Sequence, residues 1–151
     1  MVRGRPKEIV VMVGGPGSGK STFVTKWMPK YERINNDTLK TLEKCKKACR
    51  EALAAGKSAV IDNTNRAADA RSHYVDIARD FGVPIRAFFF NTDKATCIHN
   101  NAQRKNNTHR EHLSKSVPSV AIHTFFKNYT KPKISEGFES VETLEFEADD
   151  F

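Results

Sequence analysis

The feature that most constrains the fold is a glycine-rich loop that directly follows a short apolar segment near the start of the chain. Residues 14–21 read GGPGSGKS, which matches the pattern G-x-x-x-x-G-K-[ST]. Residues 9–13 read IVVMV, an apolar and β-branched run that is typical of a buried parallel strand. Residues 18–27 follow with a helical pattern that ends before a proline. A strand, this loop and a helix in that order predict a site for a nucleoside triphosphate.

The residue types in this loop suit a phosphate ligand. Glycines let the backbone approach the phosphates closely, and the following helix presents its positive N-terminus to the same anion. We expect Lys20 to reach the β- and γ-phosphates of ATP and the Ser21 hydroxyl to ligate Mg²⁺. A merely flexible glycine loop would not explain this Lys-Ser pair. The expected nucleotide-binding residues are Gly15, Pro16, Gly17, Ser18, Gly19, Lys20, Ser21 and Thr22.

The rest of the chain alternates between strand-like and helix-like segments. The expected strands are 31–34, 59–61, 85–90 and 143–146, and the expected helices are 38–55, 67–81, 94–104 and 120–129. This alternation predicts an α/β fold, in which a parallel sheet of four to five strands is flanked by helices on both faces. We expect a basic, disordered tail over 1–7, one domain over 8–151 and a lid over about 104–118.

The charge of the chain is unevenly distributed. Of its 25 basic and 18 acidic residues, seven of the acidic ones and none of the basic ones fall in residues 134–151, so the first 133 residues carry 25 bases against 11 acids. A body this basic favours a polyanionic partner, although a protein that only balances ATP would also fit. The three cysteines suit a reducing, intracellular compartment, and no apolar run suggests a membrane partner.

Two aspartates at expected strand ends indicate what the triphosphate is used for. Asp37 follows the strand at 31–34, and Asp62 ends the strand at 59–61. Both should emerge at the sheet edge where Lys20 points, because ligands bind at the carboxyl ends of parallel strands. Asp37 could be only a helix N-cap and Asp62 only a magnesium partner. An ATPase motor or switch needs Asp62 alone, usually with a second acid or a glutamine that orients water. A kinase needs a carboxylate that accepts a proton from the incoming hydroxyl, and Asp37 fits that role, so we favour a kinase.

The order of several motifs makes a specific resemblance visible. GGPGSGKSTF, INNDTL, GKSAVIDNTN, FGVPIRAFFF, IHNN and EGF follow one another over roughly residues 8–146. Together they resemble the 5′-kinase domain of the polynucleotide kinase 3′-phosphatase family, relatives of the phage T4 end-healing enzyme. The resemblance implies a P-loop kinase that transfers the γ-phosphate of ATP to the 5′-OH end of a polynucleotide, an end-healing step in strand-break repair.

The resemblance also implies roles for individual residues. Asp37 matches the general base that activates the 5′-hydroxyl, and Asp62 matches the aspartate beside it that organises the acceptor and the metal, the latter together with Ser21. Thr64 and Arg71 match positions that line the nucleic-acid channel, which Asp37 and Asp62 also border. Arg104 matches a lid arginine that clamps the ATP phosphates, and the alternative is a solvated arginine at a helix end.

The chain departs from the family at a few positions. Asn36 stands where arginine is common directly before the general base. His73 stands where relatives often carry arginine, and a nearby basic residue, Arg66 or Arg79, could take its place. Around residues 125–128 the familiar basic residues are replaced, so no adenine contact can be assigned. No D-x-D pair occurs in the chain, which excludes a phosphatase nucleophile motif within it.

The expected partner is a 5′-OH polynucleotide, a single-stranded DNA end in preference to RNA, although the residues leave DNA against RNA open. We expect a monomer that is either a stand-alone kinase or part of a protein fused to a 3′-phosphatase domain, located in the nucleus if the source is a eukaryote. Two alternatives remain at this point: a small-molecule P-loop kinase and a non-catalytic ATP-binding module.

Overall fold

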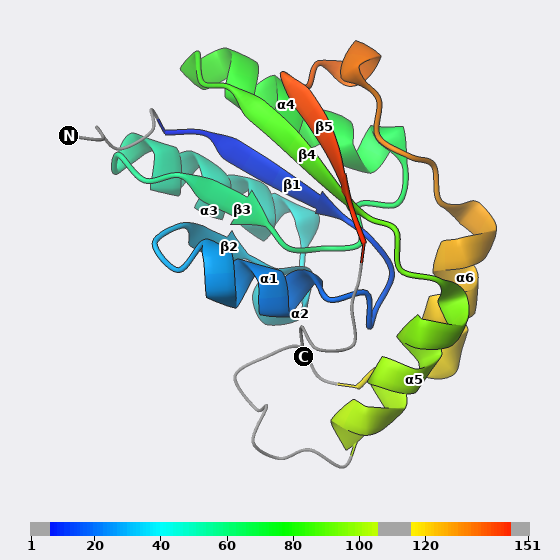
Figure 1. The fold of residues 1–151 in the computed structure, drawn as a ribbon. Helices are drawn as coiled ribbons and strands as arrows, with labels where there is room; N and C mark the ends of the chain where they lie inside the picture. The colour runs from blue at the N-terminus through cyan, green and yellow to red at the C-terminus, as the bar shows by residue number, and fades with distance from the viewer. Residues whose placement is uncertain (1–6, 106–115, 146–151) are drawn as a thin grey trace.

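A computed structural model describes residues 7–105 and 116–145 of the chain. Its centre is a five-stranded parallel sheet in the order β2-β3-β1-β4-β5 (Figure 1). The strands are β1 (Ile9–Val13), β2 (Glu32–Ile34), β3 (Ala59–Ile61), β4 (Ile85–Phe90) and β5 (Ser140–Leu144). The predicted α/β fold is therefore confirmed. Most of the predicted tail, and residues 106–115 of the lid predicted over about 104–118, lie outside the described residues.

Helices connect the strands as the alternating pattern predicts. They are α1 (Lys20–Trp27), α2 (Asn36–Leu39), α3 (Leu42–Ala54), α4 (Ala68–Phe81), α5 (Lys94–Lys105) and α6 (Ser119–Asn128), followed by the short 3₁₀ helix η2 (Ile134–Glu136). In Figure 1, α5 and α6 form a pair beyond the end of the sheet at which the strands finish. The last strand begins three residues earlier than predicted, because β5 pairs with β4 from Ser140 onwards.

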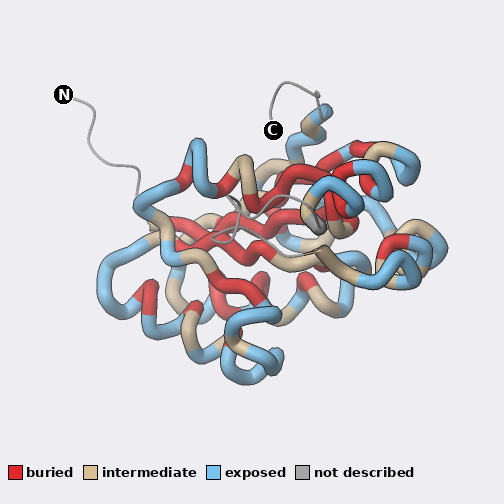
Figure 2. The backbone as a smooth tube through the Cα atoms, turned by 90° about the horizontal axis from the view of Figure 1, so that it is seen from below, coloured by how far each residue is buried: buried red, intermediate tan, exposed pale blue. Residues whose placement is uncertain are grey.

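Alternate side chains of the central strand feed two apolar clusters. Ile9, Val11 and Val13 pack with side chains of α3 and α4, while Val10 and Met12 pack on the opposite face with α1. Figure 2 shows the buried strands as a layer between the helices. Burial on both faces explains why the strand sequences are continuous apolar runs instead of alternating ones.

One predicted helix is wrong. The segment 38–55 was expected to be continuous, but it is divided into α2 and α3 at Lys40, whose φ is +76°. Thr41 then caps α3, because its hydroxyl oxygen accepts a hydrogen bond from the Lys44 N–H over 3.1 Å. The break leaves α2 as a separate four-residue helix at the end of β2.

The register of the sheet brings several loops to one edge. Ile34 of β2 pairs with Ile61 of β3, and Val11 of β1 pairs with Ile61 from the other side. The residues that follow these three strands are therefore neighbours in space although they are far apart in sequence. This edge carries every strand-end motif that the sequence analysis singled out.

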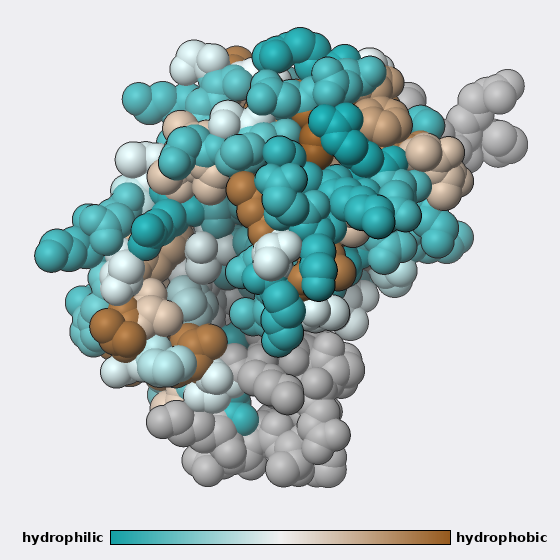
Figure 3. Space-filling model, turned by 180° about the vertical axis from the view of Figure 1, so that it is seen from behind, coloured by the Kyte–Doolittle hydropathy of each residue, from teal (hydrophilic) through white to brown (hydrophobic). Residues whose placement is uncertain are grey.

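The exterior is mostly hydrophilic on the face shown in Figure 3. Hydrophobic side chains on that face gather over α5 and α6, where Ile98 and Val120 are exposed. Within residues 7–105 and 116–145, no helix combines the length and the apolar character that a membrane crossing requires.

Candidate active site

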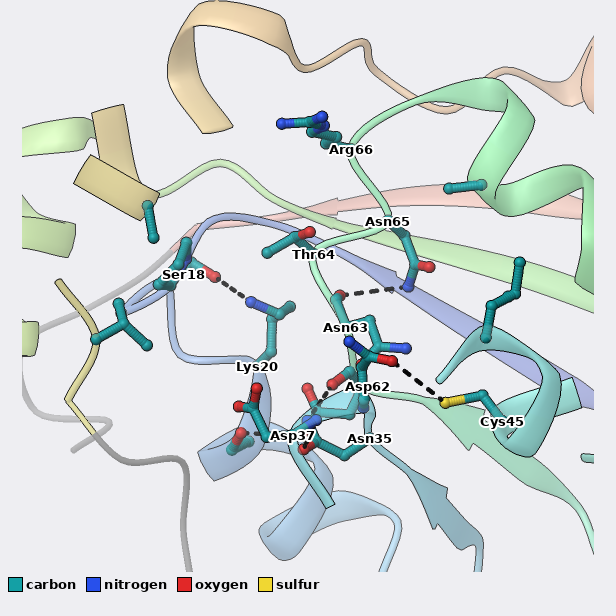
Figure 4. A pocket seen from close by; sticks show the side chains of 18 of the residues that line it. Ser18, Lys20, Asn35, Asp37, Cys45, Asp62, Asn63, Thr64, Asn65 and Arg66 are labelled. Atoms are coloured by element: carbon teal, nitrogen blue, oxygen red, sulfur yellow. Dashed lines mark hydrogen bonds between the residues drawn. The ribbon is translucent and has the colours of Figure 1, made fainter. Parts of the chain in front are cut away.

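A pocket of about 570 Å³ opens at the carboxyl edge of the sheet. Side chains from the phosphate loop, α2 and the loop after β3 lie together in it (Figure 4). Of the residues selected from the sequence, those that line it are Pro16, Gly17, Ser18, Lys20, Ser21, Asp37, Asp62, Thr64 and Arg104. The structure thus brings the predicted nucleotide and acceptor groups into one cavity.

Two glycines give the phosphate loop its shape. Gly17 has a φ of +82° and Gly19 a φ of +103°, a region that side-chain-bearing residues rarely adopt. A Cβ at position 17 would lie only 2.4 Å from the carbonyl oxygen of Cys97 on α5. Gly17 is therefore required both for its backbone conformation and for the close approach of α5.

Helix α5 and the turn before it hold the phosphate loop in place. The Asn100 side-chain amide donates a hydrogen bond to the Gly17 carbonyl oxygen over 2.9 Å, and the Thr92 hydroxyl donates one to the Ser18 carbonyl oxygen over 2.7 Å. Both side chains are buried. The sequence analysis gave neither residue a role, although the adjacent asparagines in IHNN were the available signal.

Lys20 lies inside the loop that it follows. Its ammonium group donates to the carbonyl oxygens of Gly14 and Gly15, over 2.9 Å in each case. The pKa of Lys20 is lowered to about 8, mainly by burial; the charges of Arg104 and Arg33 also lower it, while that of Asp62 raises it. The buried ammonium has exchanged water for loop carbonyls, so an incoming phosphate would meet a cation with little hydration to lose.

Ser21 and Asp62 face each other across the base of the pocket. The Ser21 hydroxyl donates to Asp62 Oδ2 over 3.0 Å, and Arg33 Nε donates to the same oxygen over 2.7 Å. Among the described residues, Asp62 Oδ1 is buried without a hydrogen-bond partner. A hydroxyl oxygen and a carboxylate oxygen with an unused acceptor position fit the hard, oxygen-preferring Mg²⁺ ion. The predicted metal residues are therefore placed where they could hold it, and Arg33 is a neighbour that the sequence analysis missed.

The loop after β3 ties the edge of the sheet together. Asn63 Oδ1 accepts a hydrogen bond from the Asn36 N–H over 2.7 Å, and the Thr64 carbonyl oxygen accepts one from the Gly14 N–H over 3.2 Å. The Asn65 side chain donates to the Met12 carbonyl oxygen over 2.7 Å. Successive residues of this loop thus bind α2, the phosphate loop and β1, and the contacts to α2 and β1 are made by asparagine side chains.

Asp37 is exposed in the pocket on the first turn of α2. The cap of that helix is Asn35, whose side-chain oxygen accepts the Asp37 N–H over 3.1 Å. The Asn35 amide also donates to the Asp62 carbonyl oxygen over 2.7 Å, which links α2 to β3. The alternative that Asp37 serves only as an N-cap is therefore wrong, and its carboxylate is available to a ligand.

The placement of Arg71 does not match the channel position inferred for it. Its side chain is fully buried, and its guanidinium binds the Glu136 carboxylate through Nε and Nη2 over 2.8 and 2.9 Å. It also donates to the carbonyl oxygens of Asn65 and Thr130. Arg71 therefore joins α4 to the segment before η2, and it is absent from the pocket lining. We correct its predicted nucleic-acid contact to a structural role.

The remaining predicted residues divide between two places. Arg104 is half-buried and lines the pocket from α5, consistent with its effect on the pKa of Lys20. Thr22 and Gly19 instead line a smaller pocket of about 260 Å³ beside Trp27 and Phe90.

The part of the main pocket near α4 carries side chains that the nucleotide motif does not account for. Arg66 is exposed, and it lines this part together with Asp69 and the half-buried His73. A basic and a titratable side chain in the same pocket as Asp37 suit an anionic acceptor next to the phosphate loop.

Comparisons with known proteins agree with this geometry. The sequence matches the AAA domain family over residues 40–132. It is 42% identical over 142 residues to the "Bifunctional polynucleotide phosphatase/kinase" of Schizosaccharomyces pombe, covering 93% of this chain and 34% of that protein. A relative with a similar name from Acanthamoeba polyphaga mimivirus is 38% identical over 148 residues, covering 94% of this chain and 34% of the relative.

The chain thus spans about a third of the length of these curated relatives. Among solved structures, Kti12 of Chaetomium thermophilum in complex with ADP-AlF3 superimposes with a TM-score of 0.71 at 13% identity, covering 94% of this chain and 92% of that one. At that identity the likeness concerns the fold alone.

Proposed function

Because this chain belongs to the AAA domain family of P-loop proteins, we propose that it is an ATP-dependent kinase that phosphorylates the 5′-OH end of a polynucleotide. The observation that carries the proposal is the position of Asp37. Its exposed carboxylate shares one pocket with Lys20 and with the Ser21–Asp62 pair. A kinase needs a second carboxylate of this kind as the proton acceptor for the incoming hydroxyl.

In the proposed reaction, Asp37 accepts the proton of the 5′-hydroxyl while the hydroxyl oxygen forms a bond to the γ-phosphorus. The bond between that phosphorus and the β–γ bridging oxygen breaks, and ADP leaves. Lys20 neutralises charge on the β- and γ-phosphates, and Arg104 is placed to do so from α5. Ser21 and Asp62 would hold Mg²⁺, which supplies further neutralisation of phosphate charge.

The fixed geometry of the pocket supports transfer by positioning. The loop after β3 binds the Asp37 segment and the phosphate loop simultaneously, through Asn63 and Thr64. Acceptor and donor would therefore be held in a set relation, which is where most of the rate enhancement of a phosphoryl transfer arises.

The polynucleotide as acceptor is supported by the names of the curated relatives and by the basic charge of the first 133 residues. Thr64, Arg66 and His73 line the part of the pocket that would receive it. We propose single-stranded DNA in preference to RNA, a monomeric kinase domain over residues 8–151, and linkage to a 3′-phosphatase domain in the full protein. Action in the nucleus follows if the source is a eukaryote.

The experiment that tests this function is the transfer of γ-labelled phosphate from ATP, with Mg²⁺, to DNA and RNA oligonucleotides with 5′-OH ends. Asp37→Asn serves as the inactive control, and oligonucleotides with a 5′-phosphate serve as the blocked acceptor. The proposal is supported if only the oligonucleotides with a 5′-OH end become labelled, at that end. The amount of label on DNA and on RNA shows which is the preferred acceptor.

Salt dependence distinguishes a polynucleotide acceptor from a small one. The affinity for a single strand should fall with rising salt, with a logarithmic slope of roughly −0.7 for each phosphate contacted. If no oligonucleotide is labelled although ATP binds, the proposal is wrong and a small-molecule acceptor becomes the better explanation.

A further inference from the structure

Arg33 lies on the residues that would hold the metal. Its Nε atom is 2.7 Å from Asp62 Oδ2, and its Nη2 atom donates to Ser21 Oγ over 3.2 Å. Ser21 Oγ itself lies 3.0 Å from the same carboxylate oxygen, so the three side chains close a triangle. One guanidinium therefore contacts Asp62 through Nε and Ser21 through Nη2.

The position of Arg33 follows from the alternation of β2. Ile34 points to the sheet face covered by α3, so the preceding residue points to the opposite face, where α1 begins with Lys20 and Ser21. Arg33 is registered against Val60, which belongs to the apolar cluster of that second face. The guanidinium therefore reaches Ser21 and Asp62 from this second face of the sheet.

The charges of the site give this contact its meaning. The Asp62 side chain is only 1% exposed, and a carboxylate at that depth needs a positive partner. Arg33 provides one, and its own side chain is 30% exposed, which leaves it a route to solvent. Lys20 and Arg104 bring two further positive charges close by: the charge of Asp62 raises the pKa of Lys20, and that of Arg104 lowers it.

A divalent cation that binds Ser21 and Asp62 would disturb their contacts with Arg33. Mg²⁺ binds oxygen at about 2.0–2.1 Å. An ion on Ser21 Oγ would therefore lie no more than about 5.3 Å from Arg33 Nη2, given the 3.2 Å between that nitrogen and the hydroxyl oxygen. The guanidinium and the metal would then compete for the same two oxygen-bearing side chains.

We propose that Arg33 supplies the positive charge of the metal site while no metal is bound. It then binds Ser21 and Asp62, and it releases them when a divalent cation enters. Arg33 is thus a positioning residue that sets the affinity for the metal and keeps the buried carboxylate paired in its absence. The inference rests on the proposed use of Ser21 and Asp62 as the metal side of the triphosphate site.

The proposal predicts an effect opposite to that of a purely structural ion pair. If Arg33 only supported the fold, its removal would leave the metal affinity unchanged or reduce it. If it competes with the metal, its removal increases the metal affinity and destabilises only the metal-free protein. The sign of the change therefore separates the two explanations.

The test is Mn²⁺ binding to the 151-residue protein in the presence of ADP, followed by the electron paramagnetic resonance signal of free Mn²⁺. Arg33→Gln should bind Mn²⁺ on the order of tenfold more tightly than the wild type, and Arg33→Lys should fall between them. The thermal midpoint of Arg33→Gln should decrease without Mn²⁺ and ADP, and recover when both are added. The matched control is Arg79→Gln, which breaks the exposed Arg79–Asp76 pair of α4 and should change neither quantity.

Equal or weaker Mn²⁺ binding by Arg33→Gln overturns the inference. Arg33→Lys provides the same comparison with the charge retained if Arg33→Gln fails to fold. Absence of Mn²⁺ binding in the wild type overturns it as well, because the metal site itself is then misplaced. Equal or weaker Mn²⁺ binding by Arg33→Gln leaves the proposed reaction untouched, whereas absence of Mn²⁺ binding in the wild type would also remove the metal role of Ser21 and Asp62; transfer itself is decided separately by the labelling of 5′-OH oligonucleotides.

Discussion

The Asn100 side chain donates a hydrogen bond to the carbonyl oxygen of Gly17 over 2.9 Å, so helix α5 holds the phosphate loop from outside the pocket. Asn100→Ala should therefore loosen the loop and weaken ADP binding by about tenfold, the effect of one lost buried hydrogen bond. Isothermal titration of ADP checks this. Asn128→Ala, which removes an exposed bond within α6, should leave ADP affinity unchanged. Equal ADP affinity in both variants would show that the loop holds its shape without α5.

Gly17→Ala and Gly56→Ala form a matched pair. Both glycines have a φ of +82°, but a Cβ at position 17 would lie 2.4 Å from the Cys97 carbonyl oxygen, whereas nothing lies within 4 Å of one at position 56. Both changes should cost about 1 kcal/mol in backbone strain, and Gly17→Ala about 1–3 kcal/mol more for the clash. Unfolding in urea measures the difference. Equal losses in free energy of unfolding would contradict the close approach of α5.

Asp37→Asn should separate binding from transfer. Asp37 is exposed, so its replacement should change the free energy of unfolding by less than about 0.5 kcal/mol. Loss of the proton acceptor should lower the rate of transfer from ATP by about 10²–10⁴-fold, with ADP affinity unchanged. Single-turnover kinetics give the rate. Asp69→Asn alters a second carboxylate of the same pocket and should retain transfer; comparable loss in that variant would move the base away from Asp37.

Glu136→Gln should destabilise the protein in a pH-dependent way. Burial raises the pKa of Glu136, but its hydrogen bond to Arg71 and the charge of Arg71 lower it more, so the folded-state pKa lies below the ordinary value of 4.5. The pair therefore stabilises the fold above that value, and the stabilisation is lost as the pH falls through the folded-state pKa.

The free energy of unfolding of Glu136→Gln should accordingly be about 3 kcal/mol below that of the wild type at neutral pH, with the difference shrinking as the pH falls below 4.5. Denaturant titrations at several pH values measure it. Glu43→Gln, at an 82% exposed side chain, should be nearly neutral throughout. A difference that does not change with pH would mean that the charge of Glu136 contributes nothing to the pairing with Arg71.

The parts of the fold predicted from the sequence are those with strong local patterns. The strands at 9–13 and 59–61 are apolar runs, the strand at 85–90 is apolar except for Arg86, and the bounds of all three agree with the structure. The helix at 38–55 was drawn too long, because nothing in its composition marks Lys40 as the residue that takes a positive φ. A single backbone angle is settled there by the packing of β2, α2 and α3.

The site was predicted at the level of motifs, and less well at the level of side-chain partners. The phosphate loop, Asp37 and Asp62 lie together because parallel strands end at one edge. Arg71 was misplaced, since a helix position does not say whether a guanidinium meets solvent or a distant Glu136. The role of Arg33 could not be predicted either. The alternation of a three-residue strand shows to which face its side chain points, but not which atoms the guanidinium reaches.

Because α2 and α3 are separate helices, their exposed surfaces can change independently in evolution. Helix α2 buries no side chain completely and is fastened through Asn35 and the loop after β3. Helix α3 is held mainly by the buried side chains of Cys45, Cys49 and Leu53, and it touches α2 through Cys45 and Asn36. Substitutions on the exposed side of α3 can therefore accumulate without moving Asp37. Evolution could therefore change the exposed face of α3 while Asp37 stays in the pocket.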